Sequence, residues 1–348
     1  MYMKSLLKQA AFIACLLPVA AAAQKQKITV TDLPAQQQVV IAVNGKPFTT
    51  LIYSDTMEKP FLYPIYAANG TTVTRGFPRN PEPGDPTDHP HHIGLWLNYE
   101  NVNGLDFWNN SYNIPAAKKS QYGWIHTDRI SAAESGSKGK LAYEASWTNQ
   151  QRNVLLREKT SFLFSAEGEA RIIDRTTTLT AVEDVSFPDI KDGFLGLRVA
   201  HELELPVKQA KEYKDDKGNI TRVNETKDAR VTGNYLTSAG KQGDSAWGSR
   251  GSWCMLYGKK GGDSISILII DHPENPGYPT YWHARNYGLF AANPLGQKIF
   301  SEGREALNYK LAAGNSVTFR YRIVINAAGR SLNSAQITAY ETAFKKSQ

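Results

Sequence analysis

Three histidines and a carboxylate stand within five residues in the segment Asp88-His89-Pro90-His91-His92. Imidazole titrates near neutral pH, transfers protons and ligates metals. The chain has only seven histidines, so this clustering in a Gly/Pro-rich segment is typical of a site. Asp88 is placed to orient one imidazole as its hydrogen-bond partner. The sequence therefore predicts a functional loop, the alternative being a rigid turn whose histidines bond to backbone carbonyls.

The spacing of the histidines predicts which of them act together. An extended backbone sends alternate side chains to the same side, and Pro90 favours extension at the residue before it. We therefore expect His89 and His91 on one side and His92 on the other. Two imidazoles on one side suit general acid–base catalysis, or one divalent metal ion held by His89 and His91.

A second polar segment, 271–288, is rich in proline and carries His272, Trp282, His283 and Arg285. Trp282 is suited to stacking on the apolar face of a sugar ring. Arg285 is suited to binding a carboxylate or hydroxyl groups. The alternative is an aromatic lid over the core, with no ligand.

A third segment places Lys191, Asp192 and Arg198 around the apolar run 194–197. One pair of these charges could form a buried salt bridge, and another group could act as an acid or base. A purely structural ion pair is an equally good interpretation.

Strands must position these segments, because the chain has a β pattern almost throughout. The apolar runs 39–43 and 49–53 flank Asn44-Gly45, the pair favoured in two-residue hairpin turns. The run 264–270 is continuously apolar, and 317–325 alternates as a half-buried strand does. The polar stretch 208–228 predicts a long solvated loop or a protruding hairpin. We therefore expect an all-β protein, a large antiparallel β-sandwich formed by residues 24–330 as one domain.

Only the end of the chain has a helical pattern. Asn333 is suited to cap a helix with Gln336 three residues on, and Glu341 can pair with Lys345. Residues 331–348 are therefore expected to form a short C-terminal helix docked on the sandwich.

The first residues predict export. A short basic start, an apolar run and Ala20–Ala23 are typical of a signal peptide spanning 1–23, so we expect a periplasmic or secreted protein. No later segment has the pattern of a membrane span. A net charge of +7 without a Lys/Arg block argues against nucleic acid as a partner. Phosphate-binding loops, dinucleotide fingerprints and the His-Glu-x-x-His motif are absent, which disfavours nucleotide chemistry and zinc proteolysis.

Four motifs together resemble a known family. They are DHPHHIGLWLNYENVNGLDFW, KDGFLGLRVAHEL, WGSRGSWCMLYG and DHPENPGYPTYWHARNYGLFAANPLG. They resemble the secreted bacterial family labelled "methane oxygenase PmoA", a domain of largely unknown function, over about residues 60–325. The resemblance implies a galactose-mutarotase-like β-supersandwich whose members bind or transform carbohydrates in a cleft. Mutarotases pair a histidine acid with a glutamate base, and Glu202 and Glu274 are the nearest candidates for that glutamate.

The motifs and the resemblance together lead to one main hypothesis, an exported carbohydrate-active enzyme of the hydrolase, lyase or epimerase class. The expected catalytic residues are His89, His91, Asp192 and His283, with His89 and His91 as candidate ligands of one divalent metal. The expected substrate-binding residues are Arg75, His92, Lys191, Arg198, His272, Trp282 and Arg285. The alternatives are a non-catalytic carbohydrate-binding protein and the metal-dependent oxidoreductase that the family label suggests.

Overall fold

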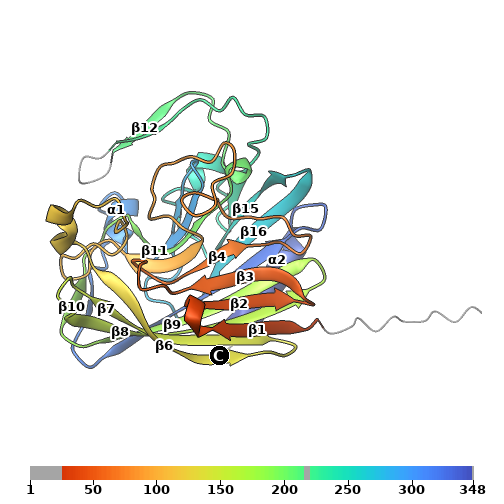
Figure 1. The fold of residues 1–348 in the computed structure, drawn as a ribbon. Helices are drawn as coiled ribbons and strands as arrows, with labels where there is room; N and C mark the ends of the chain where they lie inside the picture. The colour runs from red at the N-terminus through yellow and green to blue at the C-terminus, as the bar shows by residue number, and fades with distance from the viewer. Residues whose placement is uncertain (1–25, 215–219, 347–348) are drawn as a thin grey trace, which may run out of the picture.

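The computed structural model describes residues 26–214 and 220–346, and the expected signal peptide lies outside them. The described chain contains two eight-stranded sheets with antiparallel strand pairing (Figure 1). In spatial order, the first sheet contains β1 (Ile28–Leu33), β2 (Gln38–Val43), β3 (Lys46–Ile52), β4 (Phe61–Ile65), β5 (Leu95–Tyr99), β11 (Gly193–Arg198), β18 (Leu289–Asn293) and β17 (Tyr281–Ala284). The second contains β14 (Asn234–Thr237), β15 (Trp253–Lys260), β16 (Asp263–Asp271), β20 (Ser316–Asn326), β9 (Ala170–Ala181), β8 (Val154–Glu167), β7 (Gly139–Thr148) and β6 (Trp124–Glu134).

Smaller elements connect and cover the sheets. Two strand pairs stand apart, β10 (Val185–Phe187) with β19 (Tyr309–Leu311) and β12 (Lys211–Lys214) with β13 (Ile220–Val223). The helices are α1 (Gln297–Phe300) and α2 (Ser334–Lys345), with 3-10 turns at Pro34–Gln36, Ala116–Gln121, His201–Leu203 and Gly243–Ala246. None of the helices in residues 26–214 and 220–346 has the length and apolar character needed to span a membrane.

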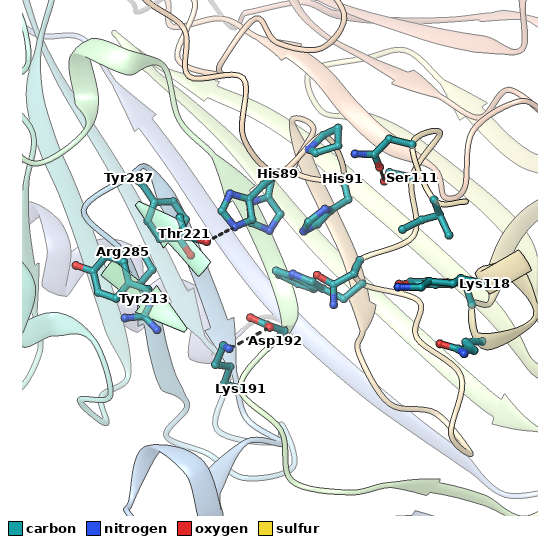
Figure 2. A pocket seen from close by; sticks show the side chains of 18 of the residues that line it. His89, His91, Ser111, Lys118, Lys191, Asp192, Tyr213, Thr221, Arg285 and Tyr287 are labelled. Atoms are coloured by element: carbon teal, nitrogen blue, oxygen red, sulfur yellow. Dashed lines mark hydrogen bonds and ion pairs between the residues drawn. The ribbon is translucent and has the colours of Figure 1, made fainter. Parts of the chain in front are cut away.

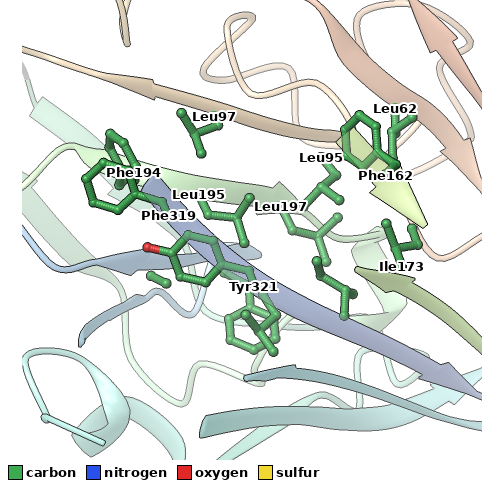
Figure 3. Packing of buried hydrophobic residues seen from close by; sticks show 14 of the residues in the cluster. Leu62, Leu95, Leu97, Phe162, Ile173, Phe194, Leu195, Leu197, Phe319 and Tyr321 are labelled. Carbon is green, nitrogen blue, oxygen red and sulfur yellow. The ribbon is translucent and has the colours of Figure 1, made fainter. Parts of the chain in front are cut away.

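The core lies between the two sheets. Side chains alternate across a strand, so β20 turns Phe319 and Tyr321 toward the first sheet. They meet Leu195 and Leu197 of β11, as Figure 3 shows. The antiparallel β-sandwich predicted from the strand patterns is thus confirmed, as is the short helix at its C-terminal end.

Local signals read from the sequence are also confirmed at two turns. Asn44 and Gly45 both have positive φ and join β2 to β3 as a two-residue hairpin. Asn333 caps α2 by accepting from the Gln336 backbone N–H at 3.0 Å. The helix covers the outer face of the second sheet, where Phe344 packs in one cluster with Val324.

A buried polar network, which the sequence did not predict, lies within the second sheet. The Glu158 carboxylate accepts from the Tyr143 hydroxyl and from the Trp147 Nε1–H, each at 2.7 Å, and from the Thr160 hydroxyl at 2.6 Å. The Arg175 guanidinium lies 3.4 Å away as its counter-ion. Both charged side chains are at most 2% exposed, so each depends on the other for compensation.

The first sheet is buried on both faces at its centre. Every residue of β5, β11, β18 and β17 is buried. One face contacts the core. On the other face, residues paired across neighbouring strands form a row that crosses all four strands. The row runs from Trp96 on β5 through Gly196 on β11 and Ala291 on β18 to His283 on β17. This row forms a floor, and the functional loops lie over it.

Because Gly196 has no side chain, the indole rings of two tryptophans can pack against its backbone on this floor. A Cβ at that position would lie 2.5 Å from the Trp96 ring and 2.9 Å from the Trp108 ring. Both indoles are buried, so neither can move aside freely. We expect Gly196→Ala to lower the free energy of unfolding by about 1–3 kcal/mol, measured by urea denaturation. An unchanged unfolding midpoint would mean that the indoles are not tightly packed on this strand.

Candidate functional site

A cavity of about 520 Å³ lies over the floor of the first sheet, on the face away from the core. The histidine loop forms one wall, and Lys191 and Asp192 lie across from it (Figure 2). The stretch 108–122 contributes Trp108 and a set of amides and hydroxyls. These polar side chains are Asn109, Ser111, Asn113 and Gln121.

The histidine loop is a turn and not an extended strand. His89 has φ of +46°, and the His92 N–H donates to the His89 carbonyl at 3.0 Å. The turn gathers all three imidazoles. The His89 and His92 rings stack with centroids 4.8 Å apart, and the His91 and His92 centroids are 4.3 Å apart. The expectation that His92 points away from the other two was therefore wrong, because a left-handed residue breaks the alternation.

Asp88 orients the His89 imidazole, as the sequence predicted. Burial alone would raise the pKa of Asp88, but Arg198, His89 and Arg75 together hold it well below its usual range. The ionised carboxylate accepts from His89 Nδ1. His89 Nε2 is then the lone-pair nitrogen, and it lies 3.3 Å from the Thr221 hydroxyl at the cavity.

Stacking fixes the plane of the His89 ring. It lies between His92 and Tyr287, whose ring centroid is 5.1 Å away at an interplanar angle of 4°. Together with Asp88, these contacts hold Nε2 in one direction. The arrangement suits a general base or acid that works at a fixed position.

The arginines expected to bind substrate instead build the loop. Arg75 donates to the Asp88 carboxylate at 2.9 Å and to the backbone carbonyls of Asp88 at 2.8 Å and His89 at 2.9 Å. Arg198 donates to the same carboxylate at 2.9 Å. Neither guanidinium lines the cavity, and both side chains are 0% exposed. The substrate-binding role predicted for Arg75 and Arg198 is corrected, because their hydrogen-bonding capacity is directed at Asp88 and its loop.

Asp192 is the one carboxylate on the cavity wall among residues 26–214 and 220–346. Its pKa is raised because the group is buried, although Lys191 and a hydrogen bond with Glu100 oppose that shift. Lys191 Nζ lies 3.7 Å from its Oδ2. The carboxylate bonded to His89 is that of Asp88 and not that of Asp192. Asp192 is therefore a second, separate titratable group in the cavity.

His283 supports the site from below and does not line the cavity. Its side chain is 1% exposed, and its Nε2 accepts from Arg285 Nε at 3.1 Å. Its Nδ1 faces Asp192 Oδ1 at 3.6 Å. Burial, with the nearby charges of Arg285 and Lys191, holds the pKa of His283 well below its usual value, so the ring is neutral. His283 was predicted to be catalytic, but it lies behind Arg285 and Asp192 and does not face the cavity.

Two other predicted residues lie away from the cavity. Trp282 packs in the core between the sheets and donates from Nε1 to the Gly251 carbonyl at 3.1 Å. The His272 ring packs on Phe344 of α2, with centroids 5.1 Å apart. Neither can touch a ligand in this cavity, so both binding roles are corrected.

The glutamates considered as mutarotase-like bases also lie elsewhere. Glu202 pairs with Lys260 at 3.0 Å, and Glu274 pairs with Arg320 at 3.0 Å. Neither lines the cavity.

The sequence did not reveal four aromatic and hydroxyl residues at the cavity. Trp108 and Tyr287 belong to two of the four family motifs, but their residue types alone did not indicate a binding role. Tyr213 and Thr221 lie on the β12–β13 hairpin, which Figure 1 shows above the first sheet. A protruding hairpin was one of the two structures predicted for 208–228, the other being a solvated loop. The polar composition of this segment gave no sign that it contributes to a cavity.

Lys59 is buried behind the histidine turn and offers a pH test of this packing. Its ammonium donates to the His91 carbonyl at 2.8 Å, and burial lowers its pKa to about 8. An unfolded lysine has a pKa of about 10.4, so between about pH 8 and 10.4 the folded chain binds fewer protons than the unfolded chain.

The free energy of unfolding of the wild type, compared with that of Lys59→Met, should therefore rise as the pH increases from about 8 to 10.4. The rise should reach up to about 3 kcal/mol, and it should be lost again as the pH falls to 8. Urea titrations at several pH values measure it. Parallel curves for the two proteins would contradict the burial of this ammonium.

The described side chains around the cavity do not form a structural metal site in which the protein supplies every ligand. Within residues 26–214 and 220–346, no group of three or more His, Cys, Asp or Glu side chains is arranged to hold an ion. Structural zinc sites use four such ligands. Metal binding by His89 and His91 stays a prediction, and no step below depends on it.

The family of this chain follows from its match to a known family model. The model described as "Family of unknown function (DUF6807)" matches residues 38–340. The chain belongs to that family. That family description does not support the methane oxygenase label, and no curated protein matches the sequence.

Solved structures resemble the DUF6807 protein only remotely. GH36 alpha-galactosidase AgaB from Geobacillus stearothermophilus is 11% identical with a TM-score of 0.40, over 87% of this chain and 41% of that chain. A putative aldose 1-epimerase from Escherichia coli K12 is 10% identical with a TM-score of 0.34, over 86% and 99%. A galactose mutarotase-like protein from Clostridium acetobutylicum is 8% identical with a TM-score of 0.33, over 86% and 98%.

The DUF6807 protein thus spans about two fifths of the alpha-galactosidase it resembles. Resemblances at these scores say nothing about its substrate, so its function has to be inferred from the site.

Proposed function

We propose that this DUF6807 protein is an exported carbohydrate-active enzyme that moves protons between a bound sugar and two groups, His89 and Asp192. The observation that carries the proposal is their placement on one cavity (Figure 2). His89 is oriented by an ionised carboxylate, and Asp192 is a carboxyl whose pKa burial raises. A base and an acid with different environments facing one cavity are typical of acid–base enzymes.

The lining of the cavity suits a sugar. Flat faces come from Trp108, Tyr213 and Tyr287, and stacking on such faces suits the C–H side of a sugar ring. The amides and hydroxyls of the 108–122 stretch can exchange hydrogen bonds with sugar hydroxyls. A volume of about 520 Å³ lies within the usual range for small-ligand sites.

The chemistry follows from the hydrogen bonds. With Nδ1 donating to Asp88, His89 Nε2 carries the lone pair, and a bound sugar that displaces the Thr221 hydroxyl can give it a proton from a hydroxyl or a carbon acid. Asp88 then stabilises the imidazolium that forms, as a carboxylate does in histidine dyads. Asp192, protonated more readily than an ordinary aspartate, donates a proton to the leaving or ring oxygen. Proton removal and proton delivery are steps common to sugar epimerases, lyases and hydrolases.

The first test is a turnover screen. Purified protein is incubated with neutral, amino and acidic oligosaccharides, and products are detected by mass spectrometry. We expect at least one glycan to be converted. Binding of a glycan in the cavity without any product would instead favour a non-catalytic carbohydrate-binding protein, and absence of both would contradict the proposal.

A further inference from the structure

Arg285 presents a guanidinium whose direction is fixed before any ligand arrives. His283 accepts from its Nε at 3.1 Å, which holds one edge of the group. Two aromatic rings also contact the group, with the Arg285 Cζ 4.7 Å from the Tyr213 centroid and 4.5 Å from the Trp247 centroid. Figure 2 shows Arg285 and Tyr213 side by side at the cavity.

The charge of this guanidinium acts on the Asp192 carboxyl and lowers its pKa, but the two groups form no ion pair. In the part of the chain that the structure describes, no carboxylate forms an ion pair with Arg285, whereas Arg75 and Arg198 both pair with Asp88. Arg285 lines the cavity, and its one side-chain hydrogen bond to a described residue uses Nε and not the Nη nitrogens. A guanidinium offers two parallel N–H donors that match the two oxygens of a carboxylate or sulfate.

The charges of the lining favour an anion. Among the described residues, the cationic side chains on the wall are Lys118, Lys191 and Arg285, and the one carboxylate is Asp192. Lys191 lies 3.7 Å from Asp192, and burial raises the pKa of that carboxyl, so its repulsion toward an incoming anion is reduced. The cavity therefore carries an excess of positive charge that an anionic ligand would neutralise.

We propose that the cavity selects sugars bearing an oxyanion, a carboxylate or a sulfate, and that Arg285 binds this group through its two Nη nitrogens. The inference rests on the proposed carbohydrate function and narrows its substrate class. His283 acts as the positioning residue: its neutral ring accepts from Arg285 Nε and leaves the outer edge of the guanidinium for the ligand.

The test compares matched sugars by isothermal titration. The probes are glucuronate, its methyl ester and glucose, then galacturonate with galactose, and glucose 6-sulfate, each also as an oligosaccharide where the monosaccharide is too short to bind. We expect the wild-type protein to bind an acidic member at least about tenfold more tightly than its neutral counterpart, as a charge-assisted bidentate contact would give. Whether the carboxylate or the sulfate series shows the larger preference distinguishes the two oxyanions.

Variants then assign the preference to Arg285. Arg285→Gln should weaken binding of the acidic sugar by roughly 10- to 100-fold while changing the neutral sugar little. Arg129→Gln, which removes one positive charge on the exposed strand β6, should leave both affinities unchanged. The ester comparison needs no variant, so it stands even if Arg285→Gln fails to fold.

Each remaining outcome contradicts the inference. Equal binding of acidic and neutral sugars, or equal loss of both in Arg285→Gln, would overturn the oxyanion site and leave the carbohydrate function intact. No binding of any sugar would overturn the proposed function, and the oxyanion site with it.

Discussion

His89→Ala should lower turnover of the glycan found by screening by about 10²- to 10⁴-fold, the usual contribution of a positioned acid–base group. The reason is geometric. His89 Nε2 is the one imidazole nitrogen at the cavity whose direction is set both by a carboxylate, Asp88, and by stacking on His92 and Tyr287. The loss should fall on kcat, because the cavity walls that hold the sugar remain. Initial rates over a range of substrate concentrations separate kcat from KM.

The matched control is His126→Ala. His126 stacks on Trp124 at a different depression, which it lines together with Asn149 and Arg152, so its removal should leave both constants unchanged. A second variant, Asp88→Asn, should also reduce kcat, because an amide no longer holds the His89 proton on Nδ1. Full turnover in His89→Ala would contradict the acid–base assignment.

Glu158→Ala should lower the free energy of unfolding by about 3–5 kcal/mol, because it leaves the Arg175 charge buried without a partner. The Tyr143 hydroxyl and the Trp147 N–H would also lose the carboxylate that accepts their hydrogen bonds. Since a domain's total stability is about 5–15 kcal/mol, this single change removes a large fraction of it. Urea denaturation of the purified proteins measures the effect.

The double variant Glu158→Leu/Arg175→Met is the control for this prediction. Replacing both partners of a buried ion pair by apolar residues is often neutral or stabilising, so most of the loss should be recovered. If the double variant were as unstable as Glu158→Ala, the lost stability would come from disturbed packing and not from an unpaired buried charge. If Glu158→Ala were as stable as the wild type, the pair would not be buried as described.

Patterns set by local physics could be predicted from the sequence. The Asn44-Gly45 hairpin and the Asn333 cap depend on a few neighbouring residues, and both were found as expected. The strand run 264–270 became β16, because a continuous apolar stretch suits a strand buried on both faces. The histidine segment, Lys191 and Asp192 were each candidate site residues, but nothing in their spacing showed that they share a cavity.

Features set by tertiary context could not be predicted. Whether Trp282 or His283 faces the core depends on the register of β17, and a shift by one residue would exchange them. The positive φ at His89 reversed the expected direction of His92. Arg198 was named as a possible ligand contact, but the sequence could not show that Asp88 would neutralise it from 110 positions away.

The most direct test of the account is to find where a bound sugar lies relative to the histidines. Imidazole NMR signals of the protein are recorded with and without the glycan found by screening, and are assigned by single substitutions. The account predicts that the His89, His91 and His92 signals shift, while those of His126 and His272, which lie away from the cavity, do not. Shifts confined to His126 or His272, or none at all with the sugar bound, would contradict it.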